Sequence, residues 1–440
     1  MGPPLYAITQ GGRSCDSKEE REDFAMRERI QVPTIRLISQ IAPPLRILTL
    51  ASAAFSVGQA SAAINVNPLG DSITVGVNDV AAEVGGYRFY YENLAASNLA
   101  FDLNFIGNRS SGTGTDTEHW GQSGGQAQHD RDLSTDRPGM LRAVHNITAD
   151  PTSNLAAFNP ANGKLDAMFI HAGTNSVPGP TESGSLNGGG LYGVDNAFDA
   201  MKNLLLAGTV GISTNVTGAT GSFPTIANPE GVHAQLNKAS VANSQSHVFV
   251  AGIIPLFEDF GLQGGGAAGS LNTYNGVGEY NNKVKDLLDN NATLNDAGSS
   301  VTYHYVDMFS ITVNELDLDW LADLFTSGDV SALTALISPD SESGGTDFVD
   351  WGLGFDESTW DEGALGTDET IYTGFNANLL GDGPGSFDSG IHPTDLGYAV
   401  MANVWYNASA SVLVPEPSSV VLVLAGSSLI FARRRRSFQA

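Results

Sequence analysis

Short apolar runs recur along this chain, and several of them lead directly into glycine. They lie at residues 103–108, 165–173, 246–256 and 301–309, after a shorter alternating stretch at residues 64–66. Runs of this kind are typical of strands buried on both faces of a parallel sheet. Helical patterns lie between or after them, at residues 86–97, 194–208, 280–290 and 394–412. The alternation predicts an α/β fold with a parallel sheet that helices cover on both sides.

Two regions do not fit this alternation. The region near 176–231 contains long polar stretches rich in glycine, serine, threonine, asparagine and proline, and residues 310–387 combine some helical signal with an acidic, glycine-rich run. Both regions are predicted to be insertions on a smaller core. Functional loops of a parallel α/β sheet follow the carboxyl ends of its strands, so we expect a site at that edge.

The net charge of the chain limits the kinds of partner that it can bind. The net charge is −27, but many basic residues lie at the two ends, so residues 63–432 keep ten basic against 42 acidic residues, a net charge of −32. Such a body repels nucleic acid and anionic lipid, which predicts a solvated acidic surface and no nucleic-acid partner. The single cysteine, Cys15, excludes intrachain disulfides and cysteine-based metal sites.

The first 62 residues have the pattern of an export signal. Scattered arginines precede a short apolar stretch at residues 45–57, and the small residues Ala60, Ser61 and Ala62 follow. This order matches a secretory signal with an A-x-A cleavage site. The alternative is a buried N-terminal helix.

The C-terminal residues have the pattern of a second targeting signal. Val414 precedes a Pro-Glu-Pro motif at 415–417, an apolar run at 418–432 and four arginines at 433–436. The run is shorter than the roughly 20 residues of a typical span, and the arginines favour a cytoplasmic end. The order resembles the PEP-CTERM sorting signal. That resemblance implies a transient membrane anchor, processing by an exosortase-type enzyme, and delivery to the cell surface, outer membrane or extracellular matrix of a Gram-negative bacterium.

The predicted organisation therefore has three parts. Residues 1–62 form a targeting segment, residues 63–413 form one domain, and residues 414–440 form a sorting signal with a short transmembrane helix. A plain C-terminal anchor is the alternative to the sorting signal. Both alternatives place the domain outside the inner membrane.

Four short motifs follow predicted strands or open the last predicted helix. They are GDS at residues 70–72, GQSGG at 121–125, GTN at 173–175 and HP at 392–393. A parallel sheet can deliver all four to one edge, and together they supply a serine, a base and hydrogen-bond donors. Acyl transfer needs this set: a nucleophile, a proton acceptor and an oxyanion hole.

The ordered set resembles the SGNH, or GDSL-type, hydrolases. The resemblance implies a three-layer α/β/α fold with a parallel, flavodoxin-like sheet, and ester hydrolysis with no metal and no cofactor. It assigns Ser72 as the nucleophile and His392 as the general base. Oxyanion donors would be the N–H groups of Ser72 and Gly124 and the side-chain amide of Asn175.

The residue that orients the histidine is less regular. The family usually has an aspartate three residues before the histidine, but Ser389 holds that position here and Asp388 stands one residue earlier. A bulge at Gly390 would still bring Asp388 to the imidazole. The alternative is a dyad in which a backbone carbonyl orients His392. We expect Asp395 to help cap the helix that follows.

Further motifs are similar to those of the family-three carbohydrate esterases. They are GYR at residues 86–88, NFIGNRSSG at 104–112, HWGQSG at 119–124 and IHAGTN at 170–175. The resemblance implies an exported O-acetyl esterase that removes acetyl groups from a polysaccharide, xylan-like or exopolysaccharide. Trp120, Trp351 and Trp360 are candidates to stack on sugar rings, with core packing as the alternative.

Two other functions are compatible with the same motifs. One is a lipase or longer-chain acyl esterase of the same fold, for which chain-length preference would be diagnostic. The other is a non-catalytic surface protein that kept the fold and binds exopolysaccharide. Separation of His392 from Ser72 in the folded chain would favour that second alternative.

Overall fold

The computed structural model describes residues 63–77, 85–98, 103–107, 109–112, 114, 116–128, 139–142, 144, 165–177, 193–209, 215–216, 226–239, 245–256, 266–325, 328–331, 333, 349, 352–353, 374–375, 379–380 and 391–413. The predicted signal and sorting segments lie outside these residues. The described residues belong to one compact unit that spans residues 61–440.

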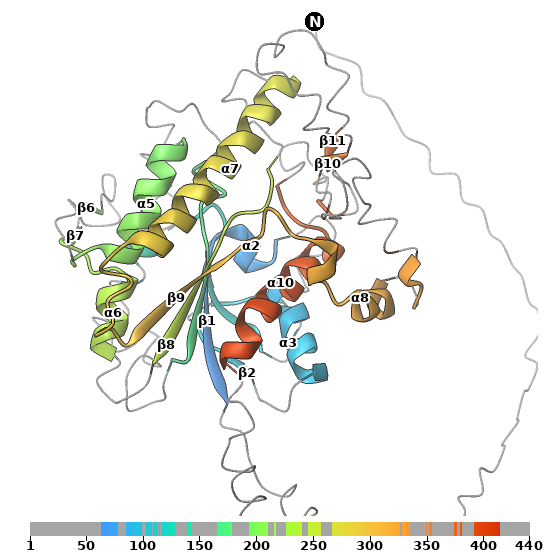
Figure 1. The fold of residues 1–440 in the computed structure, drawn as a ribbon, viewed down its shortest axis with the longest axis horizontal. Coiled ribbons are helices and arrows are strands. Elements are labelled where there is room, and N and C mark those ends of the chain that lie inside the picture. Colours follow the sequence, from blue (N-terminus) through green and yellow to red (C-terminus); the bar gives the residue numbers. More distant parts are fainter. Residues whose placement is uncertain are drawn as a thin grey trace, which may run out of the picture. The chain divides into compact units, whose positions relative to one another are not determined.

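A seven-stranded sheet forms the centre of this unit (Figure 1). Its strand order is β3-β4-β1-β5-β8-β9, with β2 also paired to β1, and every pairing is parallel except that of β3 with β4. The strands are β1 (Ile64–Gly70), β2 (Leu103–Phe105), β3 (Arg109–Ser110), β4 (Glu118–Gly121), β5 (Ala167–His171), β8 (Ser246–Ala251) and β9 (Val301–Val306). All residues of β5 are buried, as its unbroken apolar run requires.

Two short strands share one edge of β1. Strand β2 pairs with its first half, where Val66 lies opposite Phe105, and β4 pairs with its end, where Gly70 lies opposite Gly121. Strands β2 and β4 together fill a single strand position beside β1. Counted in this way, the order of the parallel strands is that of a flavodoxin-like sheet.

Helices cover both faces of the sheet (Figure 1). On one side lie α5 (Val194–Leu206), α6 (Val232–Ala239) and α7 (Gly266–Asn290), and on the other lie α3 (Tyr87–Asn98), α8 (Leu318–Phe325) and α10 (Asp395–Leu413). The predicted three-layer α/β/α fold with a mostly parallel sheet is confirmed.

An aromatic stack joins the sheet to the layer of α3 and α10. The Trp405 ring lies parallel to the Phe169 ring of β5, with ring centroids 4.6 Å apart and an interplanar angle of 5°. The Tyr87 ring also packs against Trp405, with ring centroids 5.7 Å apart. The Tyr91 ring contacts Phe169 edge-on, with ring centroids 5.3 Å apart. All four side chains are fully buried, so this contact fixes the helix that follows His392.

Truncation of this stack is expected to be costly. Trp405→Ala removes a fully buried indole from between α10 and β5, and should lower the free energy of unfolding by about 3–5 kcal/mol. Urea denaturation followed by far-UV circular dichroism measures the loss. Trp320→Ala, which removes an only partly buried indole from α8, should cost clearly less. Equal losses in the two variants would show that the stack is not a centre of stability.

The fold departs from the predicted elements in two places. Helix α7 begins at Gly266, 14 residues before the predicted helix, because glycine and asparagine hide the helical pattern of its first half. Glycine is useful there: a Cβ on Gly276 would lie 3.2 Å from Val194, so its absence lets α7 approach α5. In addition, the start of the predicted 310–387 insertion packs on α10, where Asn403 Oδ1 accepts the Asp317 N–H at 2.8 Å.

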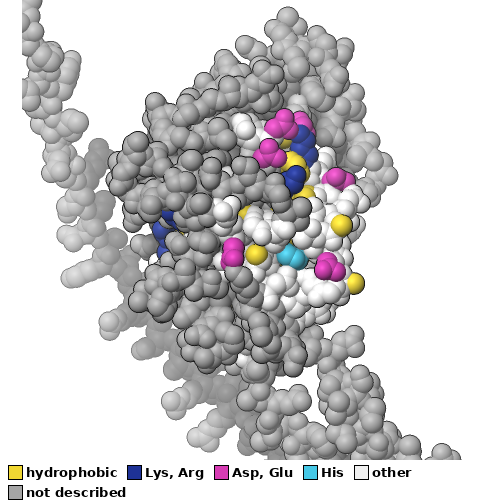
Figure 2. Space-filling model, turned by 90° about the vertical axis from the view of Figure 1, so that its left-hand side faces the viewer, with side chains coloured by type: hydrophobic (Ala, Val, Ile, Leu, Met, Phe, Trp, Pro, Cys, Tyr) yellow, Lys and Arg dark blue, Asp and Glu magenta, His cyan; other side chains and the backbone are white. Residues whose placement is uncertain are grey.

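Pairs of short antiparallel strands lie within both predicted insertions. They are β6 (Asn215–Val216) with β7 (Ile226–Ala227), and β10 (Gly352–Leu353) with β11 (Gly374–Phe375). Figure 2 shows the face that carries α5, α6 and α7; the described hydrophobic side chains appear there only as isolated spots, and acidic groups lie beside basic ones near the top of the view. Within the described part of the chain this face carries no broad apolar patch.

Candidate active site

Ser72 stands where β1 turns into a short helix, α2 (Ser72–Val75). Asp71 caps this helix, since its Oδ1 accepts the Ile73 N–H at 3.1 Å. Gly76, in the left-handed region at φ 87°, ends it. Ser72 is the first helical residue, so its own N–H has no acceptor inside the helix and faces outward from the helix start.

The turn requires glycine at the end of β1. A Cβ on Gly70 would lie 2.1 Å from Thr74 Oγ1 and 2.4 Å from the His171 carbonyl oxygen. Without that Cβ, α2 can fold back against the neighbouring strand, which places Ser72 directly at the sheet edge.

Gly70→Ala is therefore expected to destabilise the domain by about 1–3 kcal/mol and to lower any activity that depends on Ser72. Gly298→Ala is the matched control, because its added Cβ meets nothing closer than 3.5 Å. Thermal unfolding of both variants checks the prediction. A Gly70→Ala protein that melts with the control would mean that the turn has room to relax.

His392 approaches Ser72 from the other end of the chain. Its Nε2 lies 2.8 Å from Ser72 Oγ, although 320 residues separate them in sequence. His392 is partly buried, and only Pro393 and Thr394 separate it from the start of α10. The cap of α10 is Thr394, whose Oγ1 accepts the Gly397 N–H at 3.2 Å; Asp395, the predicted cap, lies in the first turn instead. A threonine one residue before the helix is the signal in the sequence that could have identified this cap.

Strand register brings the other two motifs to the same edge. Gly70 of β1 is paired with Gly121 of β4 on one side and with His171 of β5 on the other. Gly124 and Asn175 follow these strand ends by three and four residues, in the loops that flank Ser72. Gly124 adopts φ 71°, a conformation that favours glycine.

The two loops are tied to each other. Asn175 Nδ2 donates to the Gly125 carbonyl at 3.2 Å, and Gln126 Nε2 donates to the Asn175 carbonyl at 3.0 Å. These bonds fix the amide of Asn175 beside the Gly124 turn. The amide nitrogen carries two hydrogens, so an amide held in this way can also serve an oxyanion.

Removal of this amide is expected to slow catalysis rather than binding. Asn175→Ala should lower kcat for an ester by about 10²–10³-fold with KM little changed, since an oxyanion donor acts mainly in the transition state. Steady-state kinetics on a short-chain ester provide the measurement. Asn282→Ala, at an exposed position of α7, is the control. A raised KM at unchanged kcat would instead place Asn175 in ground-state binding.

A buried network supports α2 from behind. Arg88, fully buried in α3, donates to the carbonyls of Thr74 and Val75 at the end of α2, and to Ser111. Burial lowers the pKa of Arg88 to about 10, which leaves it charged at neutral pH. The GYR motif therefore supplies a brace for the nucleophile turn.

His119 belongs to the same network, and its hydrogen bonds give it a structural role. Its Nδ1 accepts the Gly121 N–H at 2.8 Å, so its Nε2 carries the proton and donates to Ser111 Oγ at 2.8 Å; Ser111 Oγ in turn donates to the Val75 carbonyl at 2.6 Å. Burial lowers the pKa of His119 to about 3, so the ring stays neutral.

Some candidates are placed elsewhere or lie outside the described residues. Trp120 is only 6% exposed, with Arg109 stacked over its ring at 5.6 Å, so it is a core residue and not a platform for sugars. Asp388, Trp351 and Trp360 lie outside the described residues, so the group that orients His392 stays a prediction.

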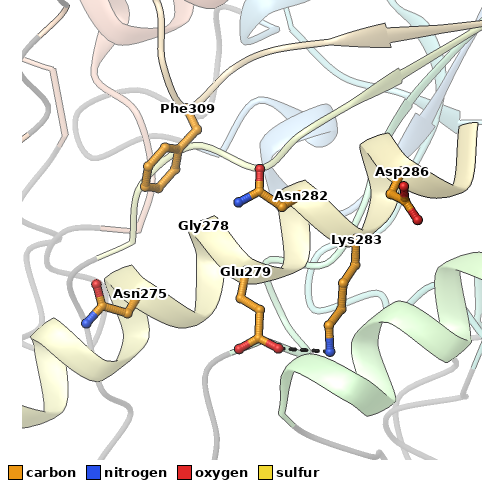
Figure 3. Close-up of a pocket in the computed structure, with 7 residues that line it drawn as sticks. All are labelled: Asn275, Gly278, Glu279, Asn282, Lys283, Asp286 and Phe309. Atoms are coloured by element: carbon orange, nitrogen blue, oxygen red, sulfur yellow. Dashed lines mark ion pairs between the residues drawn. The ribbon is translucent and has the colours of Figure 1, made fainter. Parts of the chain in front are cut away.

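A cavity of about 600 Å³ lies between α7 and the segment after β9, and the motif residues are not among those that line it (Figure 3). Its lining is Asn275, Gly278, Glu279, Asn282, Lys283, Asp286 and Phe309. Glu279 and Lys283, one turn apart on α7, form an ion pair at 2.8 Å (Figure 3). The lining holds neither a hydroxyl nucleophile nor a histidine, so the chemistry of acyl transfer belongs with Ser72.

The described ranges contain neither a metal-binding cluster nor a membrane-spanning helix. Within them, no group of three or more histidine, cysteine, aspartate and glutamate side chains is arranged to hold a metal ion. Among the helices of those same ranges, none has the length and apolar content of a membrane span.

Comparison with known proteins gives matches to solved structures only. No protein-family model matches the chain, and no curated protein matches it. A family 3 carbohydrate esterase from Clostridium thermocellum is 16% identical, with 80% of this chain and 98% of that chain covered and a TM-score of 0.36. A carbohydrate esterase family 3 structure from Talaromyces cellulolyticus is 17% identical over 56% of this chain and 80% of that chain, with a TM-score of 0.28.

A third match is an extracellular lipase from Streptomyces rimosus, 13% identical over 79% of this chain and all of that chain, with a TM-score of 0.31. All three TM-scores are below 0.5. The activity of the present chain therefore has to be inferred from its own site.

Proposed function

We propose that this chain is a serine ester hydrolase of the SGNH type. The observation that carries the proposal is the 2.8 Å contact between Ser72 Oγ and His392 Nε2 at the carboxyl edge of a parallel sheet. A nucleophile and a base in hydrogen-bond contact, beside loops with oxyanion donors, is the arrangement that acyl transfer uses. The same contact argues against a non-catalytic relative in which the two side chains have separated.

The reaction follows from these positions. Ser72 Oγ attacks the acyl carbon while its proton passes to His392 Nε2, and the carbonyl oxygen becomes an oxyanion. The N–H groups of Ser72 and Gly124 and the amide of Asn175 donate to that oxyanion. His392 then returns the proton to the leaving alcohol, which leaves an acyl group on Ser72. A water molecule, deprotonated by the same histidine, releases the acid and restores the serine.

The finer proposal is O-acetyl esterase activity on a polysaccharide. It is supported by the motifs at residues 86–88, 104–112 and 170–175, which resemble those of family-three carbohydrate esterases. The structure describes two of these motifs at the site. Arg88 of the first motif braces α2, and the last motif runs from the end of β5 into the loop that carries Asn175.

A chain-length series tests the acyl group. Nitrophenyl acetate, butyrate and octanoate are compared by kcat/KM, and acetate release from acetylated xylan is measured in parallel. The proposal predicts the highest kcat/KM on acetate, together with acetate release from the polymer. Preference for octanoate would identify a longer-chain esterase, and polymer binding without turnover of any ester would overturn the proposal of catalysis.

We also propose that the domain is exported and sorted to the cell surface through residues 1–62 and 414–440. The support is the order of apolar, small and basic residues in these segments. Expression of the full chain in a Gram-negative host with an exosortase-type enzyme tests it, with a version ending at Val414 as comparison. The full chain should lose its C-terminal segment and reach the surface fraction, while retention of both chains in the cytoplasm would contradict the proposal.

A further inference from the structure

Two buried ionisable side chains lie next to the nucleophile. Asp71 directly precedes Ser72, and His171 ends β5 opposite Gly70. Their side chains are both 0% exposed, and Asp71 Oδ1 lies 3.8 Å from His171 Nδ1. That separation allows an ion pair when the imidazole is protonated, and it is too long for a direct hydrogen bond.

Neither side chain is satisfied by other described groups. Asp71 Oδ1 accepts the Ile73 N–H, but its Oδ2 has no hydrogen-bond partner within the described part of the chain. Both ring nitrogens of His171 likewise lack a partner there. A lone buried carboxylate and a buried imidazole with two unused nitrogens are each costly, so each is the natural partner of the other.

The polar groups around Asp71 do not replace this partner. The carboxylate interacts electrostatically with three buried phenols, from α3, α7 and α10: Tyr87, Tyr280 and Tyr398. Their hydroxyls are engaged elsewhere, with Thr74 Oγ1, the Ala172 carbonyl and the Val77 carbonyl respectively. Burial raises the pKa of all three phenols, with the Asp71 charge adding to it, so they stay neutral and provide no countercharge.

We propose that Asp71 and His171 act as a buried pair in which the imidazole compensates the carboxylate charge, and that His171 is thereby a positioning residue for the Ser72 site. This inference rests on the proposed esterase function, because it concerns the oxyanion that forms beside Ser72.

The reason for this compensation is electrostatic. The Ser72 N–H is a proposed oxyanion donor, and Asp71 is the residue before it. An uncompensated carboxylate at this position would repel the oxyanion at short range in a poorly screened site. The same carboxylate accepts the Ile73 N–H and so caps α2. With His171 beside it, Asp71 can cap the helix while its negative charge is compensated near the oxyanion.

A double-mutant cycle in the full chain tests the pair. His171→Leu removes the countercharge and should lower kcat on a short-chain ester by about 10–100-fold with KM little changed. Asp71→Asn keeps an oxygen for the Ile73 N–H and should cost only a few-fold. Adding Asp71→Asn to His171→Leu should restore most of the lost kcat, because the uncompensated charge is gone. Met168→Leu, a volume-conserving change on the same strand, is the packing control.

Thermal unfolding of the same four proteins separates this inference from the proposed function. His171→Leu should lower Tm by roughly 5 °C, and the second substitution should recover part of the loss. If the wild type hydrolyses no ester, the proposed function fails and the Tm values alone decide on the pair. If the wild type is active, the kcat values decide: a double variant no better than His171→Leu, or a His171→Leu variant equal to wild type, overturns the pair.

Discussion

Ser72→Ala should lower kcat for ester hydrolysis by roughly 10⁴–10⁶-fold while the domain stays folded. The hydroxyl supplies the attacking oxygen, and Ser72 Oγ lies 2.8 Å from His392 Nε2. In serine hydrolases generally, loss of the nucleophile removes the covalent pathway and leaves only the contribution of binding and the oxyanion hole. Acetate release, followed by pH-stat at substrate saturation, measures kcat over this range.

The control for this variant is Ser310→Ala, an exposed serine in the segment after β9. It should retain wild-type kcat. Circular dichroism and Tm establish that Ser72→Ala is folded, as expected for the loss of a single oxygen. A Ser72→Ala protein with more than a few per cent of wild-type kcat would mean that another group attacks the ester.

His392→Gln is expected to have an effect of similar size. Glutamine can hydrogen-bond to Ser72 Oγ but cannot take up its proton, so kcat should fall by roughly 10⁴–10⁶-fold. The double variant with Ser72→Ala should be no worse than either single variant, because the two residues act as one unit. Single-turnover kinetics, which detect the acyl-enzyme directly, give the measurement.

The pH profile adds a second readout for the histidine. Wild-type kcat/KM should fall as the pH is lowered and the imidazole becomes protonated, while the residual activity of His392→Gln should lose that dependence. His304→Gln, at a partly buried histidine of β9, is the control and should keep the wild-type profile. A single His392→Gln variant with an unchanged acid limb would assign the base to another group.

The centre of the fold was predictable because burial leaves a direct pattern in sequence. Residues 165–173 and 246–256 read as buried strands, and β5 and β8 lie within them. Strand β4 was not predicted, since four residues with a charged start carry little periodicity. The first half of α7 was missed for a different reason: glycine and asparagine have poor helix propensity, although Gly276 lets the helix lie close to Val194 of α5.

The sequence predicted which residues belong to the site better than it predicted how they are arranged in space. The order of motifs pointed to Ser72, Gly124, Asn175 and His392, and the fold places the first and last in contact. The register that brings His171 beside Asp71 could not be read from sequence, because it depends on pairing between strands about 100 residues apart. A histidine at the end of an apolar run gave only the general signal of a buried polar side chain.

Active-site phosphonylation tests the central claim most directly. A fluorophosphonate reacts with an activated serine, and peptide mapping by mass spectrometry locates the adduct. The predicted result is one adduct per chain, on Ser72, with a labelling rate at least about 100-fold lower in His392→Gln. An enzyme that hydrolyses esters yet carries its adduct on another residue, or labels Ser72 equally well without His392, would contradict the account.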